Sequence, residues 1–183
     1  SDIPIACAGI ISKVNQVFMA ICIGISQGSQ PILGFNYGAE KYSRVRQTYR
    51  YSVTLCTVIA TIFFICFQFF PHQIVGIFGN GSDLYFHFAE KYLRIFMLMT
   101  FANGIQPMSA CFFTSIGKAR LGVIMSLTRQ VLFLLPLIVI FPVFFGIDGV
   151  MYAGPIADTS AFVLAVVFAR RELGVMKAAE QNA

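Results

Sequence analysis

The sequence predicts an all-α membrane protein, folded as a bundle of about five transmembrane helices. Of its 183 residues, 57% are hydrophobic and only 11% are charged, and the mean hydropathy is +0.76. Soluble domains contain roughly one charged residue in four, so this composition is typical of a membrane protein. Apolar runs such as VLFLLPLIVIFPVFF do not alternate with polar residues as the strands of a membrane barrel do. Helices are therefore expected, because a helix satisfies its own backbone hydrogen bonds in lipid.

Five apolar runs are each long enough to cross a bilayer, which takes about 20 helical residues. The first, at about 3–34, ends in amides, glycines and a proline, and the second, at about 51–70, is almost uninterrupted. The third, at about 88–117, has polar residues at its centre. The fourth, at about 121–145, is rich in Leu, Ile, Val and Phe, and the fifth, at about 150–168, follows the tight turn FGIDG. No linker or low-complexity tract divides the chain, so residues 1–183 are expected to form one domain.

The segment AEKYSRVRQTYR, at about 39–50, separates the first two spans. Its basic residues alternate with apolar and aromatic ones in the pattern of a helix that lies in the membrane interface. We expect such a helix on the cytoplasmic side, with Tyr42, Val45 and Tyr49 reaching into the lipid boundary. A solvated connector is the alternative.

Basic residues are concentrated in alternate connections, which predicts the orientation of the spans. Those of the first and third connections and of the C-terminal tail are Lys41, Arg44, Arg46 and Arg50; Lys118 and Arg120; and Arg170, Arg171 and Lys177. Because Lys and Arg near span ends stay in the cytoplasm, the N-terminus is expected outside and the C-terminus inside. Lys91 and Arg94, at the outer end of the third span, depart mildly from this alternation. An odd number of spans that starts outside predicts at least one further helix upstream, so the chain is expected to be a fragment of a larger protein.

One face of the first span is polar at helical spacing. It contains Gln16, Ala20, Ile23, Gln27, Gln30 and Gly34. Pro31 lacks a backbone N–H and its ring collides with the carbonyl four residues earlier, so a helix break is expected there, with the carbonyl of Gln27 released.

The third span repeats this arrangement. Gln106 precedes Pro107, which is expected to release the carbonyl of Asn103. Gln30 and Gln106 lie eleven and twelve residues before Lys41 and Lys118, or roughly 16 to 18 Å at the helical rise. Two broken helices with amides at one depth are typical of transporter substrate sites. The predicted polar cleft residues are Gln27, Gln30, Asn103 and Gln106, and the predicted apolar ones are Phe18, Phe101 and Met108.

Helix packing is the alternative explanation for these polar residues. Gly24 and Gly28 are four residues apart, as are Gly34 and Gly38, and this small-residue spacing lets membrane helices approach closely. Gln and Asn side chains would then form hydrogen bonds across the helix interfaces. Both explanations stay open at this point.

Two charged residues lie deep in the predicted membrane region. Arg129 lies nine residues beyond Arg120, and Asp158 lies twelve residues before Arg170, so their depths from the same side differ by only a few ångströms. A tight turn joins the two spans, which should pack antiparallel. Burial of either charge alone is costly, so we predict a buried ion pair. The functional alternative is that Asp158 binds a proton or a cationic drug in competition with Arg129.

Residue patterns of catalysis and of metal or cofactor binding are missing from the sequence. The five cysteines form no CxxC motif, and His72 and His87 have no ligand-like spacing around them. The sequence also lacks GxSxG, HExxH and a phosphate-binding Gly-Lys-Ser/Thr loop. We expect no enzyme activity, no cofactor and no metal. Nucleic acid is not an expected partner, because the basic residues lie between spans rather than along one face.

Four stretches, in order, resemble the second half of multidrug and toxic compound extrusion (MATE) transporters. They are QPILGFNYGAEKYSRVRQ, IQPMSACFFTSIGKAR, LTRQVLFLLPLIVIFP and FFGIDGVMYAGPIADTSAF. The resemblance implies two six-helix lobes around a central cleft, with this chain supplying the eighth to twelfth helices. Its partner would be the N-terminal lobe of the same protein, in the plasma membrane, as in the inner membrane of bacteria.

The resemblance also implies an antiporter, coupled to H⁺ or Na⁺, that exports amphipathic and often cationic compounds. In one branch of the family an acidic residue on the tenth helix takes part in coupling, whereas this chain has no Asp or Glu between Ile95 and Lys118. The coupling carboxylate is then expected in the N-terminal lobe. The alternatives are a flippase for lipid-linked saccharides, whose cleft would need more cations than Arg129 alone, and a membrane assembly module without transport activity.

Overall fold

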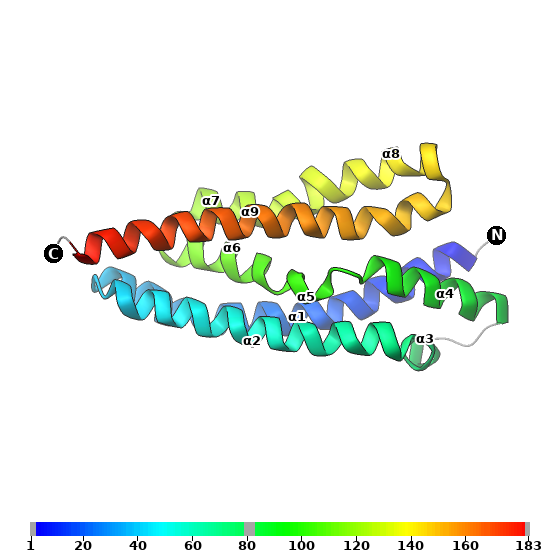
Figure 1. Ribbon diagram of the computed structural model, residues 1–183, viewed down its shortest axis with the longest axis horizontal. Helices are drawn as coiled ribbons and strands as arrows, with labels where there is room; N and C mark the ends of the chain where they lie inside the picture. The colour runs from blue at the N-terminus through cyan, green and yellow to red at the C-terminus, as the bar shows by residue number, and fades with distance from the viewer. Residues whose placement is uncertain (1–2, 79–82, 182–183) are drawn as a thin grey trace.

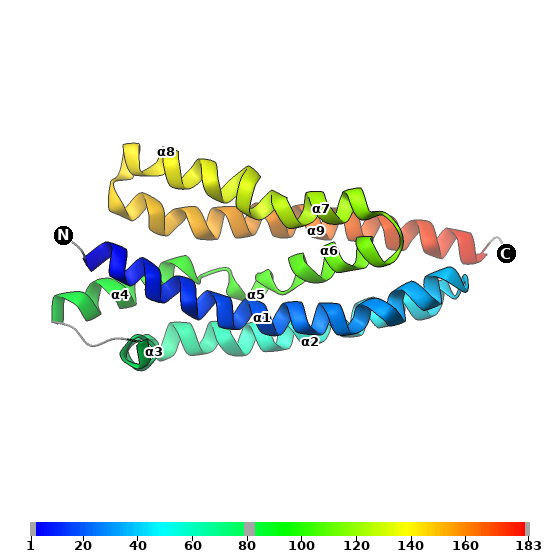
Figure 2. The ribbon, with the colours of Figure 1, turned by 180° about the vertical axis from the view of Figure 1, so that it is seen from behind.

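The computed structural model of the chain describes residues 3–78 and 83–181 and folds them into helices. The elements are α1 (Ile3–Gly38), α2 (Tyr42–Phe69), α3 (Pro71–Phe78), α4 (Asp83–Phe96), α5 (Thr100–Asn103), α6 (Ile105–Ser115), α7 (Ala119–Leu127), the π-helix η1 (Thr128–Leu134), α8 (Leu135–Phe145) and α9 (Ile147–Gln181). They run along one axis as an elongated bundle (Figure 1). The α1–α2 pair lies on one side and the α8–α9 hairpin on the other, with α4, α5 and α6 between them (Figures 1 and 2).

Membrane-spanning length confirms the predicted fold class. Within the described residues, four helical stretches are long and apolar enough to cross a membrane: 6–38, 42–69, 119–145 and 148–181. The bent pair formed by Asp83–Phe96 and Thr100–Ser115 makes a fifth. Large apolar side chains point outward along these stretches, as lipid contact requires, and Val143 is 80% exposed.

The third predicted span is not one helix, which corrects the expected range of 88–117. Its two halves, Asp83–Phe96 and Thr100–Ser115, meet at an angle of 47° across residues 97–99, and the short helix α5 opens the second half. The interruptions lie before Thr100 and at Gly104, and not at Pro107, which is the third residue of α6. Proline is tolerated in a first helical turn, whose N–H groups have no helical partner. At Gly104 the backbone of α2 comes so close that a Cβ atom would lie 3.0 Å from the backbone oxygen of Cys56.

The first span also differs from expectation, because α1 continues through Pro31 to Gly38. Proline removes a single N–H donor, and the helix around it keeps its other backbone bonds. Asn36 adds a side-chain bond, with Nδ2 donating to the carbonyl of Ile32 at 2.8 Å. Helix α1 follows a curved path rather than dividing in two (Figure 2).

Residues 39–50 do not form a separate interfacial helix. After a turn in which Glu40 has a φ of 57°, α2 begins at Tyr42 and runs without interruption to Phe69. Val45 and Tyr49 are buried in the protein core instead of contacting lipid. Tyr49 shares a hydrogen bond of 2.9 Å with Ser109 and packs on Phe112, at 4.7 Å between ring centroids. The aromatic face of this segment therefore anchors α2 to α6.

Helix α9 ends at the same end of the bundle as the turn between α1 and α2 (Figure 1). Basic and acidic side chains connect the helices there. Lys118, in the turn between α6 and α7, donates to both carboxylate oxygens of Glu172 on α9 at 2.6 Å. Arg46 on α2 pairs with Glu180, also on α9. The turns predicted to be basic thus lie together around the last third of α9.

Candidate functional site

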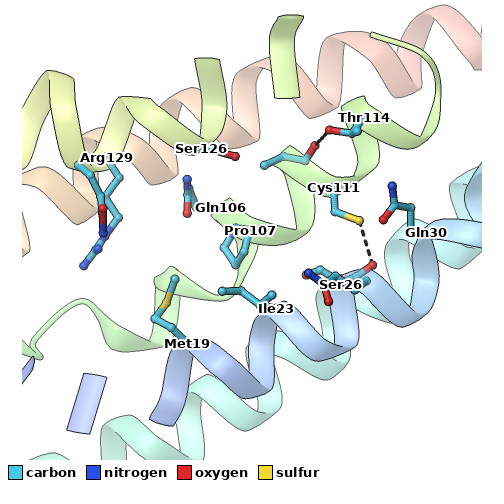
Figure 3. A pocket seen from close by; sticks show the side chains of 13 residues that line it. Met19, Ile23, Ser26, Gln30, Gln106, Pro107, Cys111, Thr114, Ser126 and Arg129 are labelled. Atoms are coloured by element: carbon cyan, nitrogen blue, oxygen red, sulfur yellow. Dashed lines mark hydrogen bonds between the residues drawn. The ribbon is translucent and has the colours of Figure 1, made fainter. Parts of the chain in front are cut away.

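A cavity of about 440 Å³ lies between α1, α6, α7 and η1 (Figure 3). Most of its lining residues have polar side chains. Its lining residues are Met19, Ile23, Ser26, Gln27, Gln30, Gln106, Pro107, Ala110, Cys111, Thr114, Ser126, Arg129 and Gln130. The cavity therefore lies among the central polar residues of the first, third and fourth predicted spans.

Helix α1 supplies five of these residues, and because each lies three or four positions from another member of the set, they share one face. Ser26 is the fixed member of this face, because its Oγ donates to the carbonyl of Cys22 at 2.8 Å and its carbonyl accepts from Sγ of Cys111 at 2.9 Å. Within residues 3–78 and 83–181, the side-chain amides of Gln27 and Gln30 form no hydrogen bond to protein. These two amides are available to a ligand.

Helix α6 forms the opposite wall. Gln106 is buried, and its Nε2 donates to the carbonyl of Met125 at 2.6 Å, which attaches α6 to α7. Pro107 lies one residue further along the same wall. Gln106 therefore packs two helices together and also lines the cavity.

The π-helix η1 forms the third wall of the cavity. It ends immediately before α8, whose second residue is Pro136. In an α-helix the ring of Pro136 would collide with the carbonyl of Leu132, and the wider π turn relieves this contact. Within this π turn Arg129 is buried in the bundle, and both Arg129 and Gln130 line the cavity.

Arg129 forms a buried ion pair with Asp158 of α9. Its Nε donates to Oδ1 of Asp158 at 2.5 Å, and the two side chains are 5% and 2% exposed. Nδ2 of Asn103 donates to the second carboxylate oxygen at 2.7 Å. Both oxygens of Asp158 thus have a donor, and the network joins η1, α5 and α9. The structure thus brings together Arg129 and Asp158, the two charged residues that were predicted to pair from their similar depths in the membrane.

The structure separates the other predicted cleft residues from the cavity. Phe18 is fully buried and packs on Phe63, at 5.5 Å between centroids, and Met108 is fully buried in the core beside Ser29. Phe101 packs against Phe64 at 5.5 Å. Asn103 is engaged with Asp158, and Pro31 is exposed and does not line the cavity.

Several lining residues have no counterpart in the predictions from sequence. Met19, together with Ile23 from the predicted face of the first span, supplies the apolar surface that had been expected from Phe18, Phe101 and Met108. Ser126 and Gln130 were also missed, although both are polar residues one helical turn apart in an apolar span, a signal that the sequence contains. Among the described lining residues, Arg129 is the one with a charged side chain.

The sequence matches one protein-family model and several individual proteins. The sequence model of the MatE family matches residues 1–147. The chain is 26% identical to the multidrug export protein MepA of Staphylococcus saprophyticus over 95% of its own length, and 21% identical to an FAD transporter of Shewanella oneidensis over 95%. It spans 39% and 38% of those two proteins.

A solved structure of similar fold is the outward-facing form of a multidrug resistance MATE family transporter of the MOP superfamily. The two superpose with a TM-score of 0.86 at 16% sequence identity. The match covers 94% of this chain and 39% of the other. At this identity the likeness demonstrates a shared fold.

Proposed function

This chain belongs to the MatE family, and from that premise we propose that it forms most of the second lobe of a multidrug efflux antiporter. The cavity at α1, α6 and η1 would be this lobe's share of the substrate pathway. The observation that carries the proposal is the pair of amides, on Gln27 and Gln30, that line the cavity and have no hydrogen-bond partner among the described residues. In a membrane interior such groups are costly unless water or a ligand bonds to them.

Amphipathic cations with aromatic rings are the substrates that this wall suits. Amide oxygens accept hydrogen bonds from a cationic group, and the side chains of Met19 and Ile23 offer apolar contact. The cavity wall within this lobe has no carboxylate among its described residues, and its one cation, Arg129, is paired with Asp158. The charge that attracts a cationic drug would then come from the N-terminal lobe.

Coupling to H⁺ or Na⁺ is proposed to use the same N-terminal lobe. Asp158 is a buried carboxylate whose ion-pair partner, Arg129, lines the cavity. Both oxygens of Asp158 already accept hydrogen bonds. A carboxylate that is held by a guanidinium and an amide is poorly suited to gain and lose a coupling ion in each cycle. We assign Asp158 to structure and the coupling carboxylate to the other lobe.

The proposed orientation puts the basic end of the bundle in the cytoplasm. Lys118 and Arg46 lie there with the C-terminal part of α9, as their ion pairs to Glu172 and Glu180 require. The positive-inside rule then gives an N-terminus outside and a C-terminus inside, in a plasma membrane.

Replacing Gln27 and Gln30 together with alanine tests the substrate pathway. We expect the affinity for a cationic dye to fall on the order of tenfold, because each lost hydrogen bond is worth about 0.5–1.5 kcal/mol. Dye efflux from cells and dye binding to the purified full-length protein are the measurements. Gln73→Ala, on the exposed surface of α3, is the matched control and should not change either. Unchanged binding together with a lower melting temperature would assign the two amides to helix packing.

Replacing Pro31 with alanine tests whether this proline serves the transport cycle. The change returns a donor to the carbonyl of Gln27 and straightens α1, so we expect efflux to slow severalfold while the melting temperature is maintained, since alanine favours helix. Pro142→Ala, within α8 and away from the cavity, is the control for removal of a helical proline. Normal efflux with reduced thermal stability would contradict the proposal.

A further inference from the structure

A groove with a volume of about 1030 Å³ lies between α2 and α9 at the basic end of the bundle. It is separate from the cavity described above and shares no residue with it. Four of its lining residues are cations: Arg46, Arg50, Arg170 and Lys177. The two helices bring together residues that are more than 100 positions apart in the sequence.

The charge of this groove is largely uncompensated. Its described lining residues include no Asp or Glu. The nearby carboxylates on α9 are already engaged, since Glu180 pairs with Arg46 and Glu172 pairs with Lys118. Arg50, Arg170 and Lys177 are exposed and form no ion pair within the described part of the chain. Three like charges around one groove repel each other unless an anion lies between them.

An apolar groove of about 390 Å³ continues from this basic groove along α2. The two share Val53 and Thr54, and the second is further lined by Thr57, Val58, Thr61 and Ile62. The threonine hydroxyls do not make this surface polar, because each donates to the carbonyl one turn earlier, at 2.9 Å for Thr54 and 2.8 Å for Thr57 and Thr61. Their hydrogen-bonding capacity is used within the helix and their methyl groups are left for apolar contact.

We propose that the two grooves together form a binding site for an anionic phospholipid. The phosphate lies among Arg50, Arg170 and Lys177, and an acyl chain follows α2 over Val53, Val58 and Ile62. Basic pockets between membrane helices recognise anionic head groups, and charge-assisted bonds from guanidinium to phosphate are strong and directional. The apolar continuation favours a lipid over a free phosphate, because a free phosphate has no group to place there.

Native mass spectrometry of the purified full-length protein tests the site. Phosphatidylglycerol and phosphatidylcholine with matched chains are titrated separately, and we expect phosphatidylglycerol to bind at least tenfold more tightly. Millimolar inorganic phosphate should not displace it. Equal affinity for the two lipids would overturn the proposal, and displacement by phosphate would identify a site for the free anion instead.

Two variants that each lose three positive charges distinguish lipid binding at a defined site from general electrostatic attraction between the lipid and this end of the protein. The combined change Arg50→Gln, Arg170→Gln and Lys177→Gln should weaken binding of phosphatidylglycerol on the order of 100-fold. The control removes three cations at the same end that do not line the groove, with Arg44→Gln, Arg120→Gln and Arg171→Gln. A defined site predicts a much smaller loss in the control, and equal losses in the two variants would contradict it.

Discussion

Replacing Arg129 with alanine is expected to lower the free energy of unfolding by about 3–5 kcal/mol. Asp158 is 2% exposed in the intact protein, and the change leaves its carboxylate with Asn103 as the one remaining donor from the network. A buried charge without its counter-ion is among the most destabilising features that one substitution can create. Asp158→Ala should have a loss of similar size, because the guanidinium is then buried without its partner.

The double substitution should lose less than the sum of the two single losses, with a coupling of at least about 1 kcal/mol. Thermal or denaturant unfolding of the purified full-length protein in detergent gives the three values. The matched control is the ion pair between Lys91 and Asp148, whose side chains are 46% and 50% exposed. Lys91→Ala should cost no more than about 1 kcal/mol, as is usual for exposed pairs. Strict additivity at Arg129 and Asp158 would refute an interaction between them.

Gly149→Ala is expected to have the second large effect on stability. Gly149 lies on α9 just after the tight turn from α8, and an added Cβ would lie 2.5 Å from the carbonyl oxygen of Phe141 and 2.9 Å from the nitrogen of Pro142. These are backbone atoms, so no side-chain rotation can relieve the contact. The two helices would have to separate, at a cost of about 1–3 kcal/mol or more.

Gly76→Ala is the control for this glycine substitution. A Cβ at Gly76, in α3, meets no atom within 4 Å. Alanine is the better helix former by up to about 1 kcal/mol, so stability should be maintained or slightly increased. Melting temperatures of both variants, measured under identical conditions, make the comparison. A Gly149→Ala protein as stable as the parent would show that the close approach of α8 and α9 is not required.

Features that depend on local sequence were predictable. Each span of the confirmed helical bundle follows from an apolar run of sufficient length, because the cost of placing a residue in lipid depends mainly on that residue and its neighbours. The similar depths of Arg129 and Asp158 could also be counted from the sequence, because helical rise is nearly constant. The same counting put Gln30 and Gln106 at one depth, and the structure places both at one cavity.

Features that depend on which helices touch were not predictable in this way. The third span bends at residues 97–99 and not at Pro107, and a glycine is needed at Gly104 because the backbone of α2 passes close to it at Cys56. Tyr49 is buried in the protein, and not in lipid, because Ser109 and Phe112 of α6 lie opposite it. Whether an apolar or aromatic residue faces lipid, core or cavity depends on its neighbours in space. The hydropathy value of the residue is the same in all three cases, so it cannot distinguish them.

The sequence by itself therefore determined that the chain is a bundle of apolar helices with basic residues in alternate connections, along with the residues whose burial would be costly. The tertiary structure alone decided how those residues are satisfied. Asn103, one of the predicted cleft residues, donates to Asp158, whereas Gln27 and Gln30 stay without a partner within the described chain. The reason is physical: a single residue sets its own cost of burial, but the hydrogen-bond partner that offsets this cost lies on another helix, tens of positions away in the chain.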